Sequence, residues 1–412
     1  MLVFTHQIRA RTGNLRVSRF VPETEKDIDA IPPSRYAGRM INAKAELEIF
    51  LIVAPGLESA LCDEVRACGF RAPKSVTGGV TIKGGWEDVW RANLELRGTS
   101  RVVARIGAFR VLHLAQLDKR ARRFAWGDVL RQDIPFRVEA SCKSSRIYHS
   151  GAAAERVERA IREELGAASS ADAEVCVRVR IENDLCTIGV DTSGDLLHKR
   201  GHKQAVNKAP MRETLAALLL RLCGFDGSEP VVDPMCGSGT FVIEAAEIAA
   251  RLKPGRSRRF AFEQLASFNE AAWHRMKDVE SRTKPTARFY GSDRDAGAVA
   301  MSRANASRAG VSDIAEFHQL AISDLKAPDG PPGLVVVNPP YGDRIGDKHR
   351  LSALYRALGQ SLAAKFVGWR VGLITNERSL AVATGLPFAT PVGPIAHGGL
   401  RVSLFLTAPL KA

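Results

Sequence analysis

The sequence predicts an α/β fold in its carboxyl-terminal half, preceded by a smaller α+β region. After residue 205, short apolar segments alternate with segments of helical periodicity, which is typical of a doubly wound, mostly parallel sheet. Before it, residues 46–109 alternate strand and helix patterns in a βαβαβ order, which is typical of a small ferredoxin-like sandwich.

The amino-terminal half divides into a tail and two subdomains. Residues 1–44 are polar, Arg-rich and without periodicity, so we expect a disordered tail. The first subdomain has expected strands at 46–53, 76–82 and 101–109 and helices at 57–68 and 86–96. The second has a strand at 136–140, a helix at 152–164, and a hairpin of 175–182 and 185–191 that turns at Asn183-Asp184.

The carboxyl-terminal half supplies the strands of the parallel sheet. Strands are predicted at 231–233, 287–291, 315–319, 334–337, 371–375 and 400–406, and helices at 240–251, 296–309 and 352–364. Ligands of such sheets bind at the carboxyl ends of the strands. The motifs described next all lie at predicted strand ends.

Composition narrows the class of partner and the compartment. With 412 residues, the chain has room for two or three domains of about 150 residues each. Lys and Arg total 59 against 45 Asp and Glu, a net charge of +14 that favours a nucleic-acid partner. The seven cysteines form no CxxC pair and no zinc-type cluster, so we expect no metal and a reducing cytoplasm. The apolar stretches are shorter than the roughly 20 residues of a membrane span, and no pattern indicates an oligomeric state.

The segment from Asp233 to Thr240 is the candidate cofactor loop. Its two glycines permit positive φ and close approach of the backbone, and the following helix offers free N–H groups to a carboxylate. Val242 replaces the third glycine of the dinucleotide fingerprint, and no lysine follows as in a P-loop. The loop therefore suits a compact ligand with little phosphate. Its candidate cofactor-binding residues are Asp233, Pro234, Cys236, Gly237, Ser238, Gly239 and Thr240.

Two further acids follow the next strands. Asp293 at the end of the second strand can accept both hydroxyls of a ribose, and Asp324 after the third can accept from an adenine amino group. Taken singly, each also suits a helix cap or a turn. As an ordered set with the loop, they resemble the arrangement of S-adenosylmethionine-dependent enzymes.

The sequence Asn338-Pro339-Pro340-Tyr341 directly follows the apolar strand at 334–337 and supplies the catalytic candidates. The prolines stiffen the loop, so that the Asn338 side-chain oxygen and the Pro339 carbonyl can both accept from a planar –NH2 group beside the cofactor. Tyr341 offers a stacking face for a base, worth about 1–3 kcal/mol. Catalysis would then consist of alignment and polarisation of the amine. Loops of this type serve adenine N6, cytosine N4, guanine N2 and glutamine alike.

These segments, together with LHKRG at 197–201 and APMRETLA at 209–216, resemble the THUMP-containing RNA methyltransferases, and among them the 23S ribosomal RNA guanine-N2 methyltransferases. The resemblance covers about 50–410. After the tail expected at 1–44, it implies a ferredoxin-like subdomain at 45–112, a THUMP RNA-binding domain at 113–200 and, at 201–412, a Rossmann-like class I methyltransferase domain with a reversed final hairpin. It implies S-adenosylmethionine as cofactor, and Pro210 and Thr214 near its methionine end. It also implies that a chain ending at residue 412, with one such domain, places one kind of mark.

Basic residues beside aromatic residues form the predicted RNA-contacting patches, near Trp126 and Tyr148 and at the junction of the two halves. The candidate residues are Lys119, Arg120, Arg122, Arg123, Lys143, Arg146, Lys199, Arg200, Lys203, Arg258 and Arg259.

Two alternatives stay open at this point. One is an adenine-N6 methyltransferase acting on RNA or DNA, against which the THUMP-like half favours RNA and the Gly342-Asp343-Arg344 continuation favours guanine. The other is a non-catalytic RNA-binding protein that retains the fold. An intact cofactor loop together with an intact Asn-Pro-Pro-Tyr argues against it.

Overall fold

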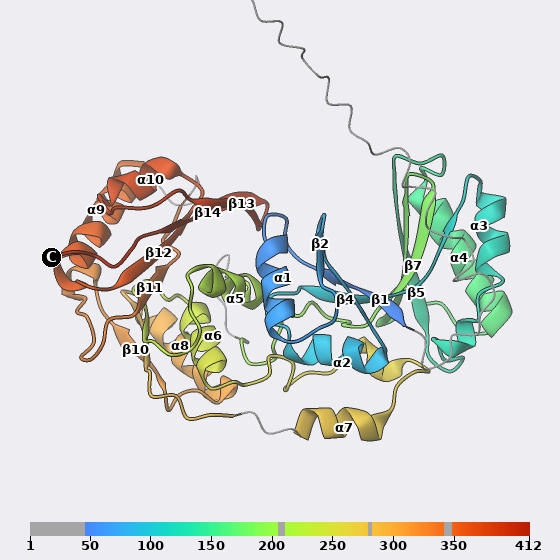
Figure 1. Cartoon of the computed structure of the whole chain (residues 1–412), viewed down its shortest axis with the longest axis horizontal. Helices are drawn as coiled ribbons and strands as arrows, with labels where there is room; N and C mark the ends of the chain where they lie inside the picture. Colours follow the sequence, from blue (N-terminus) through green and yellow to red (C-terminus); the bar gives the residue numbers. More distant parts are fainter. Residues whose placement is uncertain (1–45, 205–210, 279–281, 342–347) are drawn as a thin grey trace, which may run out of the picture. The chain divides into compact units, whose positions relative to one another are not determined.

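The computed structural model describes residues 46–204, 211–278, 282–341 and 348–412, which form two seven-stranded sheets with helices packed on them (Figure 1). The predicted tail at 1–44, Pro210 and the Gly342-Asp343-Arg344 segment lie outside these ranges.

The first sheet joins both predicted subdomains of the amino-terminal half. Its strand order is β2-β3-β1-β4-β7-β6-β5. The strands are β1 (Leu47–Ile52), β2 (Lys74–Val76), β3 (Gly79–Gly84), β4 (Arg101–Arg110), β5 (Phe136–Lys143), β6 (Val175–Glu182) and β7 (Leu185–Asp191). The long strand β4 pairs with β1 over Arg101–Arg105 and with β7 up to Arg110. One continuous sheet therefore runs through both subdomains.

Four helices cover this half: α1 (Glu58–Ala67), α2 (Trp86–Glu95), α3 (Leu114–Ala121) and α4 (Ser150–Leu165). The predicted hairpin of β6 and β7 is confirmed, and Asn183 and Asp184 have φ of 51° and 62°, as a two-residue turn of this kind requires. The single strand predicted at 76–82 is wrong, because the chain reverses at Gly78, whose φ is +80°, and forms two strands. Helix α3 was not expected, since it buries only Leu117 and Ala121 and so carries almost no apolar periodicity.

The second sheet is the predicted doubly wound sheet, in the order β10-β9-β8-β11-β12-β14-β13. Its strands are β8 (Val231–Asp233), β9 (Phe289–Asp293), β10 (Ala315–Gln319), β11 (Leu334–Val337), β12 (Arg370–Thr375), β13 (Val392–His397) and β14 (Leu400–Leu406). Strands β10, β9, β8, β11 and β12 are parallel to one another. Strand β14 lies between β12 and β13 and runs antiparallel to both. The expected reversed final hairpin is confirmed.

Helices cover both faces of this sheet, which is why β11 consists of four consecutive fully buried apolar residues. Helices α5 (Glu213–Leu222), α6 (Thr240–Ala249) and α8 (Ala296–Ala309) lie on one face, and α9 (Lys348–Lys365) and α10 (Arg378–Ala383) on the other (Figure 1). Helix α7 (Glu270–Asp278) contacts α2. No helix in the described ranges is long and apolar enough to cross a membrane.

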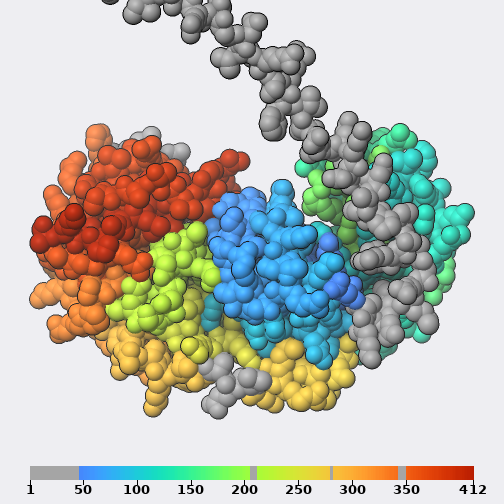
Figure 2. Space-filling view, in the orientation of Figure 1, coloured from blue at the N-terminus to red at the C-terminus, as the bar shows by residue number. Residues whose placement is uncertain are grey.

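Buried charges connect the two halves. Arg97, which follows α2, donates to Glu244 of α6 at 2.7 Å, and the buried Arg200 donates to the same carboxylate at 3.1 Å. Beside them, Arg256 donates to the fully buried Glu247 at 2.5 Å. A second contact joins the β13–β14 hairpin to the turn between β1 and α1, where the Ala396 amide donates to the Pro55 carbonyl at 3.2 Å. Figure 2 shows this red segment beside the blue one.

Candidate active site

The candidate cofactor loop runs from the end of β8 to the start of α6. Gly239 has φ of +83°, and a Cβ there would lie 3.1 Å from both Phe317 and Ser302, so glycine satisfies both the backbone angle and the packing. Two side chains of α8 form hydrogen bonds with backbone carbonyls of the loop. Ser302 Oγ donates to the Gly237 carbonyl at 2.9 Å, and Asn305 Nδ2 donates to the Ser238 carbonyl at 3.0 Å. The loop is thereby shaped by contacts within the protein itself.

Asp233 and Asp293 flank this loop at adjacent strand ends. Asp233 is buried and accepts the Met235 amide at 3.0 Å, and burial, with a smaller contribution from Asp293, raises the pKa of its carboxyl to about 8. Asp293 is half-buried and accepts the Gly237 amide at one oxygen and the Asp295 amide at the other, each at 3.0 Å. The helix cap of α8 is Asp295, which accepts from Gly297, so Asp293 is free for a different role.

The other predicted cofactor residues have different environments. Asp324 is exposed in a short turn after β10, and β10 pairs with β9, so it lies one strand beyond Asp293. Cys236 is buried and its thiol lies 3.7 Å from Ser302 Oγ. Burial raises the pKa of this thiol, which therefore suits packing under the loop and not nucleophilic attack. Thr214 is buried in α5 and lines a small cavity of about 140 Å³ that also includes Ala54 and Gly98.

The candidate reactive loop begins where β11 ends. Because Val335 aligns with Val232 in the parallel pairing of β11 and β8, the two strands end at the same edge of the sheet, and Asn338 directly follows β11 there. Its side-chain oxygen Oδ1 is buried and has no hydrogen-bond partner among the described residues. An unpaired buried acceptor costs about 1–3 kcal/mol. A hydrogen-bond donor that reached this oxygen, such as a planar amine, would relieve that cost.

Neighbouring aromatic residues fix this loop. Tyr355 of α9 donates its hydroxyl to the Pro340 carbonyl at 3.3 Å. The ring of Tyr341 is partly buried and packs against apolar core residues, and burial raises the pKa of its phenol to about 12. Tyr341 is therefore a neutral aromatic surface at neutral pH, which suits stacking and excludes a role as a base.

The described residues fit S-adenosylmethionine. The amino end of α6 offers backbone N–H groups to a carboxylate, and Asp293 offers fixed oxygens for ribose hydroxyls. Three residues that hold this arrangement were not predicted from the sequence: Ser302, Asn305 and Tyr355. For Ser302 and Asn305, the helical spacing of polar residues in α8 was the only signal in the sequence. All three residues contact loops more than ten residues away along the chain, so local patterns do not reveal these contacts.

The structure corrects part of the predicted RNA surface. Arg200 is 2% exposed and bonded to Glu244, so it cannot reach a phosphate from this position. Lys203 is buried against Glu213. Arg258 donates to the carbonyls of Ser193, Asp195, Leu196 and Lys199 and so fastens that segment, and burial lowers the pKa of its guanidinium to about 10.

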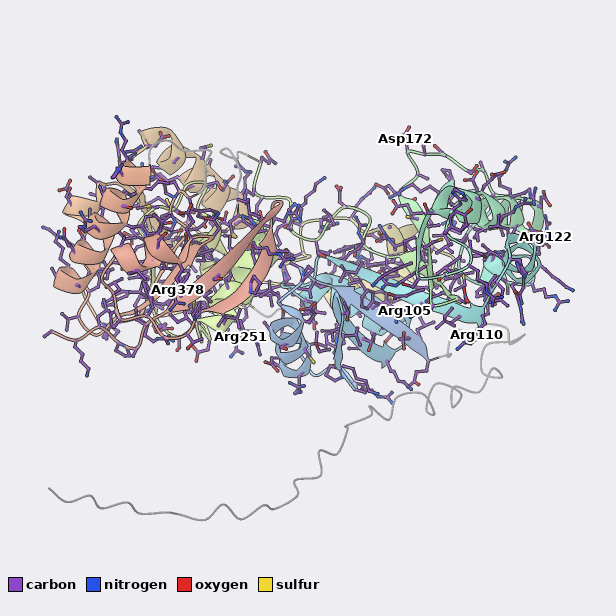
Figure 3. The ribbon with its side chains drawn as sticks, turned by 90° about the horizontal axis from the view of Figure 1, so that it is seen from above. Arg105, Arg110, Arg122, Asp172, Arg251 and Arg378 are labelled. Carbon is purple, nitrogen blue, oxygen red and sulfur yellow. The ribbon has the colours of Figure 1, made fainter. Side chains whose placement is uncertain are left out.

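The first predicted patch changes as well. Arg122, which is labelled in Figure 3, pairs with Asp118 at 2.9 Å and with Glu163 of α4 at 2.6 Å, and these carboxylates neutralise its charge. Trp126 is buried and donates its indole N–H to the Ala121 carbonyl at 2.9 Å, so it is a core residue and not a stacking surface. The predicted RNA contacts that remain exposed are Lys119, Arg120, Arg123, Lys143, Arg146, Lys199 and Arg259.

Comparison with known proteins agrees with this architecture, in which the strand order and inserted last strand define a class I S-adenosylmethionine-dependent methyltransferase. Three family models match successive parts of the chain: the RlmL ferredoxin-like domain at 48–103, the THUMP domain at 113–191, and the RMKL-like methyltransferase domain at 200–387. The chain belongs to the family of THUMP-containing methyltransferases that combines these three domains. The predicted limits at 112/113 and 200/201 stay predictions.

One curated relative and two solved structures show how far the similarity extends. The ribosomal RNA large subunit methyltransferase K/L of Vibrio campbellii is 34% identical over 344 residues, which cover 80% of this chain and 49% of the relative. The chain thus spans about half the length of the curated relatives that it matches. A structure from Listeria monocytogenes, described as a predicted N6-adenine-specific DNA methylase, is 29% identical with a TM-score of 0.81, covering 89% of this chain and 97% of that one. SMU.472, described as a methyltransferase and solved with S-adenosylhomocysteine (SAH), is 26% identical with a TM-score of 0.81, covering 90% of this chain and 100% of that one.

Proposed function

We propose that this protein transfers the methyl group of S-adenosylmethionine to the N2 amine of a guanine in RNA, with large-subunit (23S) ribosomal RNA as the substrate. The observation that carries the proposal is the buried Oδ1 of Asn338 at the sheet edge beside the cofactor loop, for which the described ranges offer no hydrogen-bond partner. The ribosomal RNA target is supported by the name of the Vibrio campbellii relative and by the THUMP match at 113–191. Guanine N2 is supported by the motif resemblance.

The reaction needs little beyond alignment. When bound, S-adenosylmethionine supplies a methyl group on a sulfonium. Asn338 Oδ1 and the Pro339 carbonyl would each accept one N–H of the amine, which turns its lone pair toward the methyl carbon. Transfer of the methyl group would leave the amine with one proton to release to water, so these two acceptors would only have to hold and orient it. Tyr341 would hold the base plane by stacking.

The amino-terminal half would bind the RNA. Tyr148 is 73% exposed, and its ring lies 4.3 Å from that of His149, in a loop whose Arg146 amide is held by Asp184 at 2.8 Å. Exposed Lys143 and Arg146 flank this aromatic pair. Cations around a fixed aromatic surface suit an unpaired nucleotide of an RNA substrate. With RNA as substrate and seven free cysteines, we place the protein in the cytoplasm.

The second candidate function is methylation of adenine N6 in RNA or DNA. The description of the Listeria monocytogenes structure favours it, and an Asn-Pro-Pro-Tyr loop suits either amine. The two are separated by incubating the purified protein with S-adenosylmethionine and protein-free ribosomal RNA or genomic DNA, followed by nucleoside mass spectrometry. N2-methylguanosine in RNA supports the proposal, whereas N6-methyladenine with no N2-methylguanosine supports the alternative.

A further inference from the structure

Two side-chain amide oxygens in the described ranges are buried without a hydrogen-bond partner, and they belong to Asn338 and Asn376. Asn376 directly follows β12, just as Asn338 directly follows β11. These strands are parallel neighbours in the sheet, with Val337 aligned with Leu373, so both asparagines lie at the same sheet edge. The proposed methyl transfer gives a role to Asn338 Oδ1 and none to Asn376 Oδ1.

Tyr355 of α9 connects the two strand ends. Its hydroxyl donates to the Pro340 carbonyl at 3.3 Å. Burial raises the pKa of this phenol, and a hydrogen bond with the side chain of Thr375, the last residue of β12, opposes the rise. Thr375 Oγ1 in turn accepts the backbone amide of Glu377 at 3.2 Å. The residues on both sides of Asn376 are therefore bound to each other, and Tyr355 holds them beside the candidate reactive loop.

The unpaired oxygen of Asn376 is costly without a ligand. A buried acceptor that has no donor destabilises a protein by about 1–3 kcal/mol, and native structures contain few such groups. Two acceptors at one sheet edge suit a ligand that carries two neighbouring donors. They do not suit a ligand with a donor beside an acceptor, because the second oxygen would then face another lone pair.

The bases that carry an exocyclic amine differ in the ring nitrogen next to it. In guanine, N1 beside the N2 amine carries a hydrogen. In adenine, N1 beside the N6 amine has only a lone pair, and the same holds for N3 beside the N4 amine of cytosine. Among these three bases, guanine alone presents two neighbouring donors on its Watson–Crick edge, which is the edge that proteins read in an unpaired base.

We propose that Asn376 Oδ1 accepts the N1–H group of the target guanine, while Asn338 Oδ1 and the Pro339 carbonyl hold its N2 amine. Asn376 is then a specificity-determining residue, which selects the base and takes no part in the transfer of the methyl group. Adenine or cytosine in the same place would leave its oxygen buried against a lone pair. This inference rests on guanine N2 as the proposed target, and it names the residue that excludes the other amines.

The test compares two RNAs that differ at the target position alone. Once the methylated guanosine has been mapped by mass spectrometry, the surrounding segment is synthesised with guanosine or with 2-aminopurine riboside at that position. 2-Aminopurine keeps the exocyclic amine but lacks the N1 hydrogen and O6. The unaltered protein should methylate the guanosine RNA with a kcat/KM at least tenfold higher, because a site built around a donor rejects an analogue that lacks it. In Asn376→Leu, this preference should shrink about tenfold, through a lower rate on the guanosine RNA.

Ser379→Leu is the matched control, because it places the same side chain at an exposed position of the adjoining helix α10. It should leave both rates unchanged. Asn376→Asp keeps an oxygen at the same position and should retain the preference for guanosine, so this variant decides the question if Asn376→Leu does not fold. The affinity for SAH, measured by calorimetry, should be the same in all three variants.

An equal loss of rate on both RNAs in Asn376→Leu overturns the proposal, because the residue would then act on the loop and not on the N1–H group. So does an unchanged preference in that variant, or an unaltered protein that methylates both RNAs equally well. Formation of N6-methyladenine without N2-methylguanosine would instead defeat the proposed function itself, and this inference with it, before Asn376 is altered.

Discussion

The backbone amide of Gly237 donates to Oδ2 of Asp293 at 3.0 Å. This bond connects the turn of the cofactor loop to the end of the neighbouring strand β9. The other oxygen of Asp293 is held by the Asp295 amide at the same distance. Each carboxylate oxygen of Asp293 thus has one hydrogen bond to the backbone and a free lone pair whose direction is fixed by the fold. This lowers the cost of ordering the side chain when a ribose binds.

Replacing Asp293 should therefore weaken cofactor binding and change little else. We expect Asp293→Ala to lower the affinity for SAH by about 10–100-fold, because two hydrogen bonds from hydroxyls to a carboxylate are lost. Calorimetry without RNA measures this. Asp295→Ala is the control: it removes the cap of α8, which costs about 1 kcal/mol of stability, and should leave SAH affinity within twofold of the unaltered protein. Equal losses in both variants would contradict the role given to Asp293.

Asp233 should make the stability of the protein fall as pH rises. Burial raises its pKa to about 8 in the folded state, far above the 3.8 of an unfolded chain. Between these two values the folded state binds a proton that the unfolded state has released, so the free energy of unfolding decreases with increasing pH. At pH below about 4 both states are protonated, so this stabilising contribution is fully present and no longer changes with pH.

The test is Asp233→Asn, which keeps an acceptor for the Met235 amide and removes the titration. The variant should unfold at higher denaturant concentration than the unaltered protein at pH 8. The difference should shrink toward pH 5. A difference that is constant over this range would show that Asp233 is ionised in the folded protein.

The buried charges between the two halves should contribute strongly to stability. Removing one partner of a buried ion pair typically costs about 3–5 kcal/mol, because the remaining charge stays buried without compensation. Arg97→Met leaves Glu244 and Glu247 with fewer cations, so we expect a cost in this range, measured as a shift in the denaturation midpoint. Arg66→Met removes an exposed pair with Asp63 and should cost less than about 1 kcal/mol. Similar shifts for both variants would argue against a buried cluster.

RNA binding should depend steeply on salt, because phosphate contacts release counterions. The double variant with Lys143→Gln and Arg146→Gln should bind RNA more weakly. The slope of log affinity against log salt concentration should become less steep by the amount expected for about two lost phosphate contacts. Tyr148→Ala should weaken RNA binding by about 1–3 kcal/mol and leave the salt dependence of the affinity unchanged, since stacking releases no ions. Gel-shift titrations from 50 to 200 mM salt measure both effects. Arg258→Gln should leave the slope unchanged, as its guanidinium is bound to backbone carbonyls.

Local patterns predicted much of the fold. Helix 296–309 and strands 315–319, 334–337 and 400–406 have the expected bounds, because periodicity and flanking glycines or caps are local signals. The order of the acidic residues at strand ends was also visible, since each follows its strand directly. Helix α3 was missed because two buried residues leave little periodicity.

The environment of charged residues was not visible. Arg200, Lys203 and Arg258 are basic residues in a basic segment, and their burial depends on Glu244, Glu213 and the carbonyls of 193–199. Only the folded chain brings those partners together. Charge patterning alone therefore predicted an RNA-binding surface where the structure has internal ion pairs and hydrogen bonds to backbone carbonyls.

The role of Asn338 in methyl transfer is tested by nucleoside mass spectrometry of protein-free ribosomal RNA after incubation with S-adenosylmethionine and either the unaltered protein or Asn338→Ala. We expect N2-methylguanosine with the unaltered protein and a loss of at least 100-fold in the variant, about 2.7 kcal/mol or more of transition-state stabilisation, while RNA and SAH binding are retained. Methylation by Asn338→Ala at the rate of the unaltered protein would contradict this role.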